Sequence, residues 1–188
     1  MAANRVGSPR DGTKPAVRTA IVMPTTPAMS EAINTKTVTA RRELTFGKLR
    51  DALRDVQSFG DRGPSRTLGN WTAAQIVEHI ALTMDHSVDG FPLEMHPPLP
   101  MKLIGRLLKR PIINNRMRPG IEMPKYMKRF LPAPDVSWGR AVDHLRRSIE
   151  RFEKASTLSA SPFFGSMSRE EWTKLHCRHA ELHFGFMA

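Results

Sequence analysis

Cysteine is almost absent from this sequence of 188 residues, in which Cys177 stands alone. A single thiol cannot form a disulfide within the chain, and it excludes a cysteine-rich zinc site as well. A metal ion could therefore be held only by histidine, aspartate or glutamate. Runs rich in Val, Ile, Thr and aromatic residues are also missing, so the sequence offers no convincing β-strand.

Long apolar runs are missing too. No run approaches the roughly 18 residues that a membrane-spanning helix needs, so we expect no transmembrane segment. Residues 16–33 are only mildly apolar and are interrupted by Arg18, Pro24 and Glu31, which makes a poor signal peptide. These absences favour a cytoplasmic protein.

Acidic residues are few relative to basic ones, which gives the chain a formal net charge of +11. The imbalance is greatest in segment 101–130, where nine Lys and Arg residues are opposed by Glu122 alone. Such a segment attracts phosphate groups, acidic ligands or anionic lipid. The plainer interpretation is a solvated basic surface, and the sequence leaves both open.

Apolar residues make up 40% of the chain, which is enough for a folded core. Residues 1–33 are rich in Pro, Thr, Ala and Gly without a hydrophobic period, and we predict a disordered tail there. Residues 34–188 then form one domain. Apolar residues recur in it at spacings of three and four, which predicts amphipathic helices. The four expected helices are Leu44–Phe59, Thr72–Asp89, Ser137–Lys154 and Ser168–Phe186.

Capping boxes support two of these helix starts, at Thr72–Gln75 and Ser168–Glu171. The connection Phe91–Asp135 is long and rich in proline, and it contains one short amphipathic helix, Met101–Lys109. Four helices that each carry an apolar stripe must bury those stripes against one another. We therefore predict an all-α fold, a four-helix bundle with a long crossover between its second and third helices.

Histidines supply the candidate chemistry. His179 and His183 lie one turn apart inside the apolar stripe of the last helix, with His176 at its margin. Two imidazoles at this spacing can bind one metal ion at about 2.0–2.1 Å. A third ligand can come from the second helix, where His79 and His86 point in nearly the same direction. Spacing alone does not choose between these two, and each histidine by itself also fits an ordinary core position.

The chain resembles a known superfamily at these positions. The segment Leu68–Thr72, followed by His79, is similar to the start of the second helix in DinB/YfiT-like four-helix bundles, and His179–His183 is similar to the histidine pair of their last helix. Residues 34–187 further resemble an uncharacterised branch of that superfamily. The shared stretches there are Arg41–Leu44, Asp89–Pro92 and Trp172–His183. One departure is Phe184–Phe186, where many members carry His/Arg-Gly-Gln.

The resemblance implies a metal site on His79, His179 and His183, and it leaves His86 and His176 as neighbours for acid–base work. Zinc suits three imidazoles, with nickel and iron as alternatives. Superfamily members of known activity are similar to thiol transferases, and others are hydrolases or isomerases. We therefore expect a metal-dependent enzyme, a transferase that uses a small thiol or else a hydrolase. Its substrate would be a small molecule, anionic or a thiol.

The basic segment supports a second hypothesis. Residues 101–130 could dock on anionic membrane or nucleic acid, with the metal in a structural role, so that the chain would be a non-catalytic binding protein. Neither a helix-turn-helix pattern nor interleaved aromatic residues point to nucleic acid. A homodimer is also considered, because such bundles commonly dimerise. Cys177 lies away from the histidine face of its helix and is not expected to be a nucleophile.

Overall fold

The computed structural model describes Met1 and residues 32–120 and 125–188. The predicted disordered tail, residues 1–33, lies outside the described residues except at Met1, Ala32 and Ile33. The division of the chain into a tail and a domain therefore stays a prediction. The described residues form helices and no strand, apart from two isolated β-bridges, so the prediction of an all-helical fold is confirmed for them.

The described part of the chain contains five α-helices and three short 3-10 helices. The α-helices are α1 Leu49–Gln57, α2 Ala73–Asp89, α3 Leu99–Asn114, α4 Trp138–Lys154 and α5 Arg169–Phe184. The 3-10 helices are η1 Thr35–Thr37, η2 Leu93–Met95 and η3 Lys125–Phe130. Among the described helices, none combines the length and the apolar character that crossing a membrane would require.

Side-chain caps begin the two helices that carry the candidate ligands. At α2, the Thr72 hydroxyl accepts a hydrogen bond from the Gln75 N–H at 3.2 Å, and the Gln75 side chain accepts one from the Thr72 N–H at 2.9 Å. Ser168 and Glu171 form the same pair at α5, at 3.1 and 2.9 Å. Both predicted capping boxes are confirmed. They satisfy N–H groups that a helix start leaves unpaired, and so fix where each helix begins.

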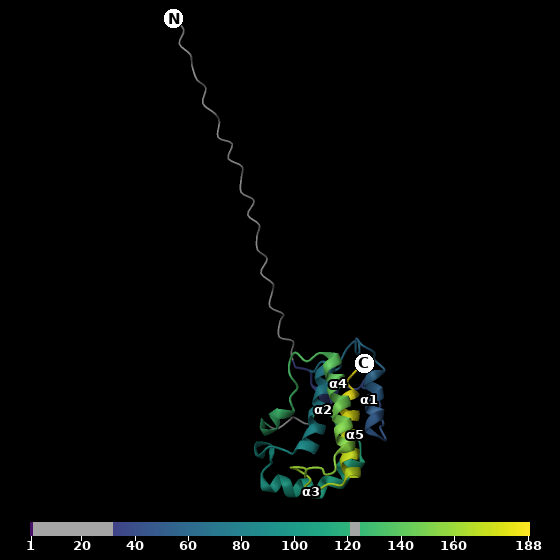
Figure 1. Ribbon diagram of the computed structural model, residues 1–188, viewed down its shortest axis with the longest axis vertical. Helices are drawn as coiled ribbons and strands as arrows, with labels where there is room; N and C mark the ends of the chain where they lie inside the picture. The colour runs from purple at the N-terminus through teal and green to yellow at the C-terminus, as the bar shows by residue number, and fades with distance from the viewer. Residues whose placement is uncertain (2–31, 121–124) are drawn as a thin grey trace. The chain divides into compact units, whose positions relative to one another are not determined.

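One hydrophobic core joins four of the helices. α2 packs along α4, α5 packs against α1 and α2, and α1 also contacts α4 (Figure 1). Side chains from each helix are buried between them, among them Val56, Ile80, Leu145 and Phe184. In these four helices, the apolar residues that recur at helical spacing in the sequence are thus the ones that face the core.

The first helix begins later than the sequence predicts. The pattern favours a helix over Leu44–Phe59, whereas α1 begins at Leu49. The backbone N–H of Phe46 instead donates to the carboxylate of Glu181 on α5, at 2.6 Å. Phe46 is buried, as its place in the apolar stripe predicts. A long-range contact with α5 therefore replaces the first helical turn.

α3 is longer than the predicted helix Met101–Lys109. It begins after Pro98 and runs to Asn114, passing through Pro111. Pro100 lies in the first turn of α3, where proline is tolerated because the N–H groups there have no partner within the helix. The last turn, after Pro111, is held by Ile113, which is buried. α3 packs against α5 and lies across the ends of the longer helices (Figure 1).

The C-terminal residues pair with the segment that leads into α2. The N–H of Ala188 donates to the Arg66 carbonyl at 3.0 Å, and the N–H of Leu68 donates to the Phe186 carbonyl at 2.9 Å. α5 ends at Phe184, two residues before the predicted end. These bonds hold Phe186 beside the entrance to α2, close to the candidate ligands.

Candidate metal centre

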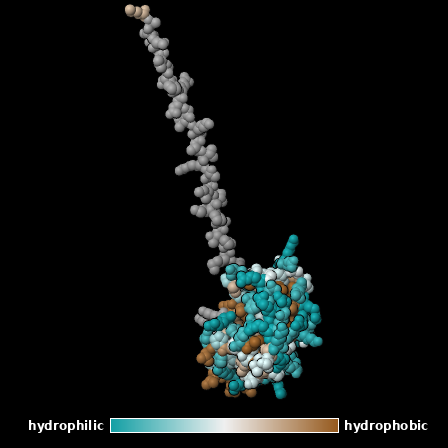
Figure 2. All heavy atoms as spheres, viewed as in Figure 1, coloured by the Kyte–Doolittle hydropathy of each residue, from teal (hydrophilic) through white to brown (hydrophobic). Residues whose placement is uncertain are grey.

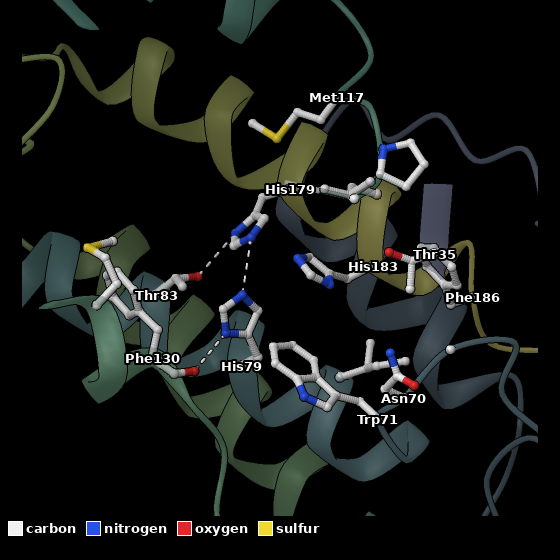
Figure 3. Close-up of a pocket in the computed structure, with 16 residues that line it drawn as sticks. Thr35, Asn70, Trp71, His79, Thr83, Met117, Phe130, His179, His183 and Phe186 are labelled. Carbon is white, nitrogen blue, oxygen red and sulfur yellow. Dashed lines mark hydrogen bonds between the residues drawn. The ribbon is translucent and has the colours of Figure 1, made fainter. Parts of the chain in front are cut away.

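His79 from α2 and His179 and His183 from α5 meet between the two helices (Figure 3). Each offers a ring nitrogen that lies within 4.8 Å of those of the other two. The Nε2 atoms of His79 and His179 are 3.3 Å apart. Within the described part of the chain, this cluster is the one group of histidine, cysteine or carboxylate side chains placed to hold a metal ion.

The distance between the two Nε2 atoms fits two ligands of one ion. Nitrogens bound at about 2.0–2.1 Å in a tetrahedral arrangement are separated by roughly 3.3–3.4 Å. The observed separation of 3.3 Å between His79 and His179 matches this value. His183 completes the group, with its ring centre 4.8 Å from that of His79 and 4.7 Å from that of His179.

The outer nitrogens of two rings face hydrogen-bond acceptors. Nδ1 of His79 lies 2.7 Å from the carbonyl oxygen of Phe130, which can only accept, so this nitrogen carries the proton. The Thr83 hydroxyl donates to the Ile80 carbonyl at 2.9 Å, and its oxygen lies 3.5 Å from Nδ1 of His179. Because Nδ1 of His79 carries the proton, its Nε2 presents a lone pair towards His179 and the space between the three rings. That lone pair can bind a metal ion or accept a hydrogen bond from Nε2–H of His179.

Burial keeps these imidazoles neutral. It lowers the pKa of His79 to about 4, against the partly opposing hydrogen bond to Phe130. The pKa values of His179 and His183 are lowered well below the usual range, first by burial and then by neighbouring positive groups. Neutral imidazole is the form that binds metal. The cluster is therefore ready to bind a cation at neutral pH without first losing protons.

A cavity of about 480 Å³ opens beside the three histidines. Much of its wall is apolar and includes Trp71, Leu182 and Phe186 (Figure 3). Its other polar side chains are Thr35, Asn70 and Thr83. The described residues that line it include no Asp, Glu, Lys or Arg. Among the described residues, the wall beside the histidines is thus uncharged and suits a small, largely apolar molecule.

His86 lies outside the cluster and does not line this cavity. Its Nδ1 donates to the Gly90 carbonyl at 3.0 Å, and its ring stacks on Phe91. Of the two α2 histidines that spacing left open, His79 is the one that the fold brings to the α5 pair. An acid–base role for His86 stays a prediction.

His176 is buried one turn before His179 and faces a second, smaller hollow of about 220 Å³. The Ser87 hydroxyl donates to the Met84 carbonyl, so its oxygen accepts from Nε2 of His176 at 3.1 Å. Burial lowers the pKa of His176 to about 3. His179 lines both hollows, so His176 is near the cluster without belonging to it. Its catalytic role also stays a prediction.

Cys177 is buried on the other side of α5. Burial raises the pKa of its thiol to about 12, with the neighbouring Glu181 adding to the effect. The thiolate is the reactive form of cysteine. The expectation that Cys177 is not a nucleophile agrees with this environment.

Two residues of the site were not identified from the sequence. Trp71 stacks on His183 with ring centres 5.7 Å apart and an angle of 15° between the planes. Trp71 directly precedes the cap of α2, the helix that carries His79, and this position in the sequence could have indicated a place beside the histidines. The Phe130 carbonyl arrives from the long connection, and no pattern in the sequence could have revealed it.

Comparison with known proteins places the chain in a family. No curated protein and no solved structure matches it. A family model described as a protein of unknown function, DUF1569, matches residues 38–188. That match spans every α-helix described above, including all three histidines of the cluster. The chain belongs to the DUF1569 family.

Proposed function

We propose that His79, His179 and His183 bind one divalent metal ion, and that the bound ion is the catalytic centre of a metal-dependent enzyme. The observation that carries the proposal is that the three rings each bring a nitrogen to within 4.8 Å of the other two, with the Nε2 atoms of His79 and His179 3.3 Å apart and Nδ1 of His79 bonded to the Phe130 carbonyl. Zinc is the ion that three neutral imidazoles suit best, with nickel and iron as alternatives.

The cavity favours a transfer reaction that uses a small thiol. Three protein ligands leave an open position, at which zinc supplies Lewis acidity and lowers the pKa of a bound water or thiol. Metal-dependent hydrolysis commonly uses a carboxylate base beside the metal, and the described lining of the cavity offers none. A thiol substrate brings its own nucleophile. The apolar wall of Trp71, Leu182 and Phe186 would exclude water and accept an uncharged co-substrate.

The chain's own residues would orient the ligands. The Phe130 carbonyl fixes the tautomer and the angle of the His79 ring, and the Thr83 hydroxyl does the same more weakly for His179. Trp71 stacks on His183 and limits its rotation. His176 and His86 are proposed as acid–base groups at the edge of the site, where they would act on the substrate after local movement.

We also propose that the fold is a four-helix bundle of the DinB/YfiT type. The proposal is supported by the four helices that share the core, α1, α2, α4 and α5, and by the crossover between α2 and α4 that contains α3. It is supported as well by the order of the ligands, with one histidine on the second bundle helix and an i, i+4 pair on the last.

Metal content tests the site directly. Protein purified without a histidine tag should carry about one zinc, nickel or iron per chain by mass spectrometry. A variant with His179→Ala and His183→Ala should lose it. His96→Ala is the matched control, because His96 is exposed and lies outside the cluster. Wild-type protein that stays metal-free after reconstitution, or a double variant that keeps its metal, would overturn the proposal.

Activity tests the thiol-transfer reaction. Reconstituted protein is assayed with cysteine-containing low-molecular-weight thiols and a chromogenic electrophile. Turnover should require the metal and should fall at least about a hundredfold in His79→Asn, because ligand loss removes the reactive centre. His176→Asn should reduce kcat while leaving the metal in place if His176 is an acid–base group. Metal-loaded protein that hydrolyses esters but transfers no thiol would reject the transferase assignment.

A further inference from the structure

The solvent side of α3 is apolar. Leu99, Leu103 and Leu107 are 79%, 62% and 74% exposed, and Ile104 and Leu108 are about half exposed. We call these five side chains the apolar face of α3. In Figure 2 apolar side chains gather at the lower left and bottom of the molecule, the region in which Figure 1 draws α3. A surface helix of a globular protein normally turns such a face inward.

α3 is held in this orientation by its opposite side. A Cβ atom on Gly105 would lie 2.5 Å from the Phe163 carbonyl oxygen, so glycine is what permits this close approach. Lys109 forms an ion pair with Glu171 of α5 at 2.7 Å. Ile113 is buried on the same side. The side of α3 that carries Gly105 and Lys109 therefore packs against the rest of the domain, and these contacts leave the apolar face exposed to solvent.

Basic residues flank the apolar face. Residues 99–120 contain six Lys and Arg and no Asp or Glu. Arg106 and Arg110 are exposed and form no ion pair with any residue that the structure describes. On the helix they lie at the edge of the face, next to Leu103. An exposed apolar strip with a cationic border combines the two features by which a surface helix binds an anionic bilayer.

We propose that α3 is a membrane-docking helix that inserts its apolar face among anionic lipids, with Arg106 and Arg110 at the headgroups. Its 16 residues give a length of about 24 Å, which is sufficient for a helix that lies in the interface. The predicted nine-residue helix would have been a weaker candidate.

Charge disfavours the other occupants. A second copy of the chain would set Arg106 and Arg110 against their own equivalents. Residues 2–31 carry four Lys and Arg and two acidic residues, so they repel the border as well. Nucleic acid would satisfy the arginines but leave the leucines without an apolar partner, and the face has no aromatic ring for stacking on bases.

The test is sedimentation of the full chain with vesicles. We expect binding to phosphatidylcholine vesicles that contain phosphatidylglycerol, and at least about tenfold weaker binding to phosphatidylcholine alone. Leu103→Asp with Leu107→Asp, and separately Arg106→Glu with Arg110→Glu, should each weaken binding at least about tenfold. All four side chains are exposed, so circular dichroism should show the variants folded.

Arg140→Glu with Arg147→Glu on α4 is the matched control. Both residues are exposed, neither has an ion-pair partner in the ranges that the structure describes, and the change in net charge equals that of the α3 variant. Binding should stay within about twofold of wild type. An equal loss in this control, or a loss in the arginine variant without one in the leucine variant, overturns insertion by α3. Failure of the wild type to bind anionic vesicles also overturns insertion by α3. This includes the case in which the wild type forms a dimer that the leucine variant dissociates.

Discussion

His144 on α4 links two carboxylates of α2. Its Nδ1 lies 2.9 Å from Glu78 and its Nε2 lies 2.8 Å from Asp85. Hydrogen bonding to Asp85, followed by that to Glu78, raises the pKa of His144. The protonated ring can donate to both acids at once, which fastens α4 to the helix that carries His79.

This pair of contacts makes the free energy of unfolding depend on pH. Because the pKa of His144 is raised in the folded state, its contribution is fully present below the unfolded value of about 6.5 and is lost as pH rises through the folded value. His144→Gln should therefore destabilise the protein by about 1 kcal/mol more at about pH 6 than at about pH 9, after allowance for solvent screening.

Urea unfolding of both proteins at the two pH values measures this difference. Comparison of variant with wild type removes the effect of the buried histidines, which destabilise the fold only when they become protonated in acid. His96→Gln, at an exposed histidine without a carboxylate partner among the described residues, is the control. A loss for His144→Gln that is the same at both pH values would contradict the assignment.

Among the elements, local chemistry made the four helices that share the core predictable. The apolar stripes predicted which side of each helix is buried. The capping boxes at Thr72 and Ser168 predicted where α2 and α5 begin, because each box is formed by two residues three positions apart. α1 began late because Phe46 bonds to Glu181, far along the chain. α3 ran longer because Ile113 is buried after Pro111. Long-range contacts leave no local pattern to find.

The candidate site likewise contains some residues that a local pattern predicts and others that it does not. The pair His179 and His183 follows from helical spacing alone. The choice of His79 over His86 depends on which turn of α2 lies level with that pair, and this is set by how the two helices pack. The outer partner Phe130 depends on the path of the connection, which no periodicity describes. Sequence can thus name ligands that share a helix more readily than the groups that support them.

Gly105 is one of the residues that hold α3 in place, and Gly105→Ala tests its contribution. Alanine normally favours a helix over glycine by about 1 kcal/mol, but the added methyl would meet the Phe163 carbonyl. We expect α3 to detach locally, with amide exchange in its backbone faster by about tenfold while the core helices stay protected. Gly139→Ala in α4 is the control, because nothing lies within 4 Å of its added Cβ. Unchanged exchange in α3 would show that the contact relaxes without cost.

At the scale of the whole molecule, occupation of the histidine cluster should stabilise the fold. Burial lowers the pKa values of His79, His179 and His183, so the three imidazoles are neutral and able to bind a cation. The cluster ties α2 to α5, two helices of the same core. A ligand that binds only the folded state stabilises it by mass action, so the proposed metal should stabilise the entire core rather than a single loop.

Removal of the metal should therefore lower the melting temperature. Occupancy at a hundred times the dissociation constant contributes about 2.7 kcal/mol, which for a chain of this size corresponds to about 5–10 °C. We expect EDTA to lower the melting temperature of metal-loaded wild type by this amount in differential scanning calorimetry, and to leave the variant with His179→Ala and His183→Ala unchanged. That variant should melt near the EDTA-treated wild type, since both lack the metal. An equal EDTA shift in the two proteins would mean that the stabilising ion binds elsewhere.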